Sequence, residues 1–152
     1  MSQRAYDKKC IALSQLESAL RCYWGGDYIA AITLAGAAEE IFGRCLQRLG
    51  RQNALASLET NTATMHKHLF GEPLDPKWVA ERANHARNAL KHLDAGGYPT
   101  VTIDTTEEAV GLLTRAIDNY WRLESSLTPA MEQFERDRRT PPQPPFSARE
   151  DA

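Results

Sequence analysis

The residues best suited to chemistry lie in one short segment, residues 81–92. This segment contains two histidines, His85 and His92, and histidine is the side chain that most readily exchanges protons near neutral pH. Arg87 carries a guanidinium that can hold a phosphate through two parallel hydrogen bonds. Lys91 adds a second positive charge. The segment is therefore a candidate site for phosphate binding and proton transfer.

Helical spacing divides this segment into two faces. Projected at about 100° per residue, its apolar residues form one stripe that is predicted to face a core. They are Val79, Ala83, Ala86, Leu90 and Leu93. Arg87 lies at the edge of this stripe, whereas His85, Asn88 and His92 lie on the opposite face. The simplest alternative interpretation is a solvent-exposed helix face, although residues 77–92 hold four basic side chains against a single acid.

A second predicted helix, from Asp27 as its N-cap to about Leu49, buries a carboxylate. Its apolar stripe comprises Tyr28, Ala31, Ala35, Phe42, Leu46 and Leu49. Glu39 projects inside that stripe, and an unpaired buried charge costs several kcal/mol. We expect Arg87 to be its partner, with Arg82 as the second choice. The ion pair would either fix how two helices dock or orient Arg87 toward a phosphate.

The whole chain predicts an all-α fold, a compact four- to five-helix bundle followed by a disordered proline-rich C-terminal tail. The small residues of the second helix place it at the centre of the bundle. The segment from Asn53 to Phe70 is less regular, and a break is expected near residue 60. We predict a bundle over residues 1–130, with the end of the last helix and the tail over 131–152. The other predicted helices span residues 6–24, 76–93 and 105–127, the last opened by a capping box at 105–108.

Composition excludes several classes of function. The chain has 152 residues and a formal net charge of −2, so bulk charge does not attract it to nucleic acid or membrane. No apolar run approaches the roughly 18–20 residues of a membrane span, and no secretion signal begins the chain. The cysteines, Cys10, Cys22 and Cys45, are interpreted as reduced core residues, which indicates the cytoplasm. His66 and His68 lack further ligands, so neither a metal nor a cofactor is expected.

The run from Arg87 to His92, RNALKH, resembles a family signature. It is similar to the Arg-x(4–6)-His motif of the HEPN (higher eukaryotes and prokaryotes nucleotide-binding) superfamily, in which a polar residue follows the arginine. The motif at the end of a late helix, with one helix after it, is also similar to that family. The resemblance covers about residues 5–127.

The resemblance implies a metal-independent endoribonuclease that acts as a homodimer on RNA. Arg87 and His92 would be catalytic, and Asn88 would be the polar supporting residue. On a straight helix His92 lies about 140° around the axis from Arg87, so a site shared between two subunits is expected. Glu39 would support Arg87, and His85 and Lys91 would add a proton-transfer group and affinity for the RNA backbone. The implied role is that of a toxin or defence effector, with an antitoxin or nucleotidyltransferase-like protein as its partner.

Two alternatives remain open from the sequence. The same polar face could belong to a non-catalytic helical module that dimerises or binds a partner protein, or to a nucleotide-binding accessory subunit. A buried Arg87 locked to Glu39, with His92 isolated from it, would favour the binding module. Two Arg87–His92 pairs lining one cleft would favour the ribonuclease.

Overall fold

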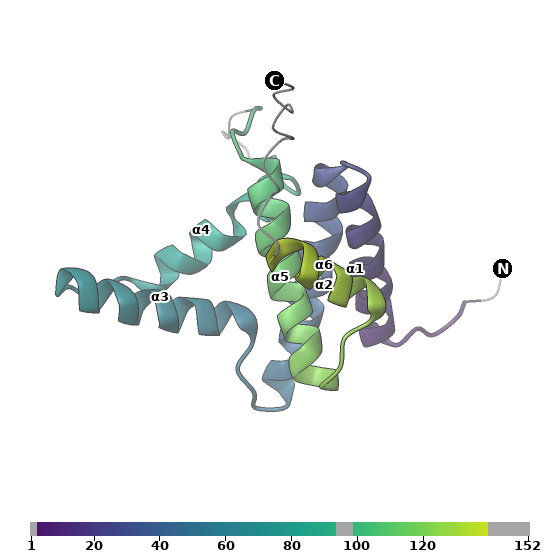
Figure 1. Ribbon diagram of the computed structural model, residues 1–152, viewed down its shortest axis with the longest axis horizontal. Coiled ribbons are helices and arrows are strands. Elements are labelled where there is room, and N and C mark those ends of the chain that lie inside the picture. The colour runs from purple at the N-terminus through teal and green to yellow at the C-terminus, as the bar shows by residue number, and fades with distance from the viewer. Residues whose placement is uncertain (1–2, 94–98, 140–152) are drawn as a thin grey trace, which may run out of the picture.

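The computed structural model describes residues 3–93 and 99–139, and every regular element in these ranges is a helix (Figure 1). This confirms the all-α fold and the helical bundle. The expected proline-rich tail lies beyond Arg139, outside the described residues. The helices are α1 (Lys8–Trp24), α2 (Tyr28–Arg48), α3 (Ala54–Phe70), α4 (Pro76–Ala89), α5 (Thr105–Glu124) and α6 (Pro129–Arg139).

Helix α2 lies at the centre of the bundle, as its composition predicts. It packs against both α1 and α5 along its length, and it also contacts α4. Its Ala31, Ala35 and Ala38 are fully buried, and small side chains of this kind let neighbouring helices approach closely. The core between these helices is completed by larger apolar residues, among them Leu16, Leu20, Ile32, Phe42, Leu112 and Leu113.

The C-terminal part of the bundle differs from the prediction of one helix over residues 105–127. Ser125 adopts a left-handed conformation with φ of 55° and ends α5, and a separate helix, α6, then begins at Pro129. Helix α6 crosses the expected boundary at residue 130. It is ordered by two buried apolar residues, Met131 and Phe134, and the Phe134 ring lies 5.5 Å from that of Tyr23. Their spacing of three residues places both on one face of the helix.

Helices α3 and α4 form a hairpin that extends to one side of the bundle, hereafter the arm (Figure 1). Helix α3 is continuous, and the break expected near residue 60 is absent. The hydroxyls of Thr60 and Thr64 donate to carbonyl oxygens four residues earlier, so these weak helix formers are satisfied within the helix. Only Ala54 of α3, with Val79 and Ala86 of α4, is buried in the arm. Its outer end exposes the large apolar residues Met65, Leu69, Phe70 and Trp78.

A buried asparagine on α5 holds the base of the arm. The Asn119 side-chain oxygen accepts a 2.7 Å hydrogen bond from the backbone N–H of Ala54, one of the first N–H groups of α3, which have no partner within their own helix. The Asn119 amide also donates to the backbone oxygen of Glu39, at 3.1 Å. One side chain thus joins α5, α2 and the start of α3.

Smaller features also depart from the prediction. Asp104, rather than the threonine after it, caps α5, because its carboxylate accepts from the backbone N–H groups of Thr106 and Glu107. The cysteines are free, but they are not core residues: Cys10 is exposed, and Cys22 and Cys45 are half-buried. None of the helices in the described ranges has both the length and the apolar character required to cross a bilayer.

Candidate functional site

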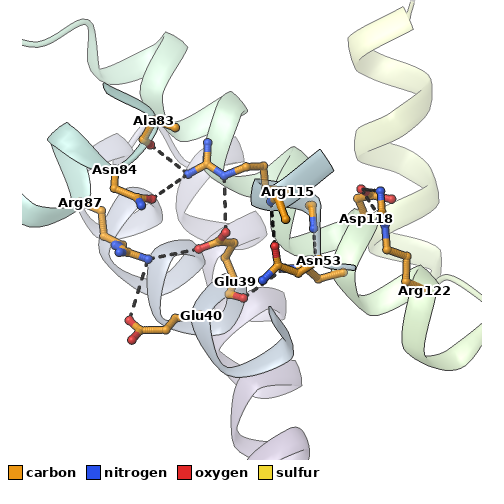
Figure 2. Close-up of polar contacts among 12 residues, drawn as sticks. Glu39, Glu40, Asn53, Ala83, Asn84, Arg87, Arg115, Asp118 and Arg122 are labelled. Atoms are coloured by element: carbon orange, nitrogen blue, oxygen red, sulfur yellow. Dashed lines mark hydrogen bonds and ion pairs between the residues drawn. The ribbon is translucent and has the colours of Figure 1, made fainter. Parts of the chain in front are cut away.

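The predicted buried carboxylate is present, and it binds two arginines rather than one (Figure 2). Glu39 is only 4% exposed, and its Oε2 lies 3.1 Å from Nη1 of Arg87. This confirms the expected ion pair between α2 and α4. Arg82, the second choice, instead pairs with Glu108 at 3.0 Å.

Arg115 of α5 is the partner that the sequence did not reveal. Its Nε lies 3.5 Å from Oε1 of Glu39, an ion pair without hydrogen-bond geometry. Its Nη2 donates to the backbone oxygen of Ala83 at 2.9 Å and lies 3.4 Å from the side-chain oxygen of Asn84 (Figure 2). Burial lowers the pKa of Arg115, and the neighbouring Glu39 carboxylate opposes that shift. Arg115 therefore connects α5 to both α2 and α4.

A glycine on α2 makes room for Arg87. A Cβ atom added at Gly36 would lie 2.6 Å from both Cγ and Cδ of Arg87, a distance far inside van der Waals contact. These atoms belong to the middle of the side chain, whose end is held by Glu39. Close packing of α4 on α2 therefore depends on this glycine.

We expect Gly36→Ala to lower the free energy of unfolding by about 1–3 kcal/mol, because forcing extra volume into a packed contact costs more than the improved helix propensity returns. Gly111→Ala on α5 is the matched control, since an added Cβ there meets nothing within 4 Å. That control should be neutral or stabilise by up to about 1 kcal/mol. Urea unfolding followed by circular dichroism measures both variants. A Gly36→Ala protein as stable as its control would show that α4 does not need this close approach.

Arg87 is largely withdrawn from solvent, with 13% of its side chain exposed. Its Nη1 also lies 3.8 Å from Oε2 of Glu40, and its Nε is buried without a hydrogen-bond partner. Its Nη2 forms no hydrogen bond or ion pair with a described residue. The side chain borders a hollow of about 230 Å³ together with Asn84 and Arg44.

The helix that carries the motif ends earlier than predicted, at Ala89 rather than near Leu93. The backbone N–H groups of Lys91 and His92 both bond to the carbonyl oxygen of Asn88, at 3.1 Å each, so the chain closes in a tightened turn. The angle between Arg87 and His92 expected from a straight helix therefore does not apply. Leu93, expected in the core stripe, is 76% exposed.

The polar residues at the end of α4 share one hollow of about 700 Å³. His85, Asn88, Lys91 and His92 all line it, with Pro99, Thr100 and Val101 on the facing segment. All four polar residues are exposed. Two imidazoles, an amide and an ammonium around one open hollow can bind a phosphate group and exchange protons with it.

Arg87 does not line this hollow, although it lies one residue from Asn88. The structure thus separates the two residues of the motif: His92 belongs to the open hollow, and Arg87 to the ion-pair cluster behind it. Within a single chain they do not face the same cleft.

In the described part of the chain, no three His, Cys, Asp or Glu residues are close enough together to hold a metal ion. His66, considered with His68, contacts the backbone oxygen of Glu72 at 2.9 Å and lies against the ring of Phe70. These contacts account for His66 as a residue that shapes the outer end of the arm.

Comparisons of this chain with protein-family models, with curated proteins and with solved structures find no match. The candidate site is therefore interpreted from its own residues.

Proposed function

We propose that this protein is a HEPN-type, metal-independent endoribonuclease that acts as a homodimer. The observation that carries the proposal is the open hollow at the end of α4, in which His85, Asn88, Lys91 and His92 converge. Ribonucleases need a group that removes the proton of the ribose 2′-hydroxyl and a group that protonates the leaving 5′-oxygen. Two histidines beside a lysine meet that requirement without a metal ion.

His92 acts as general base or general acid in this scheme. Attack of the 2′-oxygen on the adjacent phosphorus forms a 2′,3′-cyclic phosphate and expels the 5′-oxygen, which takes up a proton. His85 supplies the second proton-transfer group, Asn88 positions the phosphate by hydrogen bonds, and Lys91 attracts the RNA backbone. Arg87 stabilises the charge that develops on the phosphate oxygens.

A second copy completes the site, because Arg87 and His92 face different hollows within one chain. Two copies that meet at α4 around a two-fold axis can bring Arg87 of one subunit toward the hollow of the other. The Nη2 of Arg87, which has no partner among the described residues, is the group left to bind the phosphate. Glu39 and Glu40 then hold Nη1 and orient the guanidinium.

The motif also supports a biological role. We place the protein in the cytoplasm as a toxin or defence effector, restrained by an antitoxin or nucleotidyltransferase-like partner. This placement rests on the resemblance of residues 87–92 to the HEPN signature.

One observation favours a second function, a non-catalytic module that binds nucleotides or a partner protein. Arg87 is mostly buried and engaged by two carboxylates, and it is separated from the hollow of His92. An arginine in this setting is fully explained as a structural ion pair between α2 and α4.

The test is an RNA cleavage assay of the full-length protein in EDTA, with a labelled pool of structured and single-stranded RNAs. The expected result is cleavage that EDTA does not affect, with 2′,3′-cyclic phosphate ends on the 5′ fragments. Sedimentation analysis of the same sample should report a dimer. A well-folded dimer that leaves every RNA in the pool intact would rule out the ribonuclease and favour the binding module.

A further inference from the structure

Four basic residues outside the Glu39 cluster stand around one hollow of about 380 Å³: Lys8, Arg44, Arg48 and Lys91. None of the four forms an ion pair or side-chain hydrogen bond with any residue in the described ranges. The arginines of α4, α5 and α6, by contrast, all pair with acids. The only acid at this hollow is Glu40, which faces Arg87. The hollow, hereafter the basic groove, is thus strongly positive on a chain whose net charge is −2.

These cations come from three separate parts of the fold. Arg44 and Arg48 lie one turn apart on the same face of α2, where like charges repel each other. Lys8 begins α1, and Lys91 lies in the turn after α4. The dipole at the C-terminus of α2 favours Arg48, but it does not account for cations contributed by the other two segments. A bound anion would relieve the repulsion among all four.

The floor of the basic groove is apolar. Ala37, Ile41 and Cys45 of α2 line it between the cations. A floor of this kind can contact the sugars or bases of a nucleic acid while the surrounding cations bind its phosphates.

The basic groove is continuous with the hollow at the end of α4, because Lys91 lines both. We propose that the two form one track for single-stranded RNA. The backbone lies across Lys8, Arg44 and Arg48, and Lys91 leads it to His92. This assignment rests on the proposed function and names where its substrate is held. An acidic peptide could satisfy the charges, but it would not explain why the groove opens onto His85 and His92.

The binding test uses full-length protein carrying His92→Ala, so that cleavage does not consume the probe. A labelled single-stranded oligoribonucleotide is titrated by fluorescence anisotropy at several salt concentrations. The variant is Arg44→Gln with Arg48→Gln, and the matched control is Arg51→Gln with Lys67→Gln, two exposed cations that also lack ion pairs and lie away from the groove.

We expect the groove variant to bind about tenfold more weakly at low salt, and its log–log salt slope to fall by about 1.4, roughly 0.7 for each lost phosphate contact on a single strand. The control should stay within about twofold of the parent. Equal losses in both double variants would overturn the track, and so would polyglutamate of matched length competing as well as unlabelled RNA. Equal thermal midpoints for the two variants establish that folding is not the cause.

Cleavage assays of the same double substitutions, with His92 intact, separate this inference from the proposed function. Binding through the groove without any cleavage would support the track and overturn the ribonuclease. Cleavage at the same rate by the groove variant and the control would support the ribonuclease and overturn the track.

Discussion

Replacing Glu39 with alanine should lower the free energy of unfolding by about 3–5 kcal/mol, the range for a buried ion pair that loses one partner. The carboxylate is 4% exposed and stands between two guanidiniums that are themselves only 13% and 11% exposed. Without it, Arg87 and Arg115 would remain as two like charges in a poorly solvated cluster. Arg115 is the more vulnerable of the two, because burial already lowers its pKa.

Glu40→Ala is the control for this prediction. Glu40 is the next residue of the same helix, its side chain is 47% exposed, and it approaches Arg87 only to 3.8 Å. Exposed ion pairs of this kind contribute about 0–1 kcal/mol, so the control should be nearly neutral. Guanidinium unfolding curves, followed by both fluorescence and circular dichroism, give the two free energies. Similar small losses for both variants would contradict the view that the Glu39 cluster holds α2, α4 and α5 together.

The Glu39 cluster was half predictable from the sequence. Glu39 was identified because a carboxylate interrupts a long apolar stripe, and Arg87 because it lies at the edge of another. Arg115 was missed because α5 was considered only for its ends. The available signal was its position three residues after the buried Leu112, which places it on a side of the helix that faces the core.

The geometry of the motif was not predictable from periodicity alone. A helical projection assumes that the helix continues, and α4 ends at Ala89, where the last N–H groups close onto Asn88. Helix α6 was missed for a different reason. Its charged composition is typical of a solvent-exposed segment, but two apolar side chains, Met131 and Phe134, are sufficient to dock it on the core.

His92→Ala should reduce RNA cleavage by about 10²–10⁴-fold, the usual contribution of a general acid or base. His92 is exposed and follows the end of α4, and its side chain has no hydrogen bond or ion pair with a described residue. Its removal should therefore leave the thermal midpoint within about 1 °C of the parent, because surface substitutions of this kind change stability little. His68→Ala is the control: it removes another exposed histidine, on α3, and should leave cleavage unchanged.

Arg87→Ala serves as the complementary variant, because Arg87 has two separable roles. The loss of its ion pair with Glu39 should destabilise the protein, and the loss of its Nη2 should abolish cleavage in the dimer. Mixing Arg87→Ala with His92→Ala subunits tests whether the site is shared. If Arg87 of one subunit acts with His92 of the other, mixed dimers retain one intact site and recover about half of the parental activity of each such dimer. Single-turnover cleavage rates measured before and after subunit exchange give this recovery. No recovery, with exchange verified by mass spectrometry, would place both residues of each site in one chain and contradict the shared site, since the structure separates them within a chain.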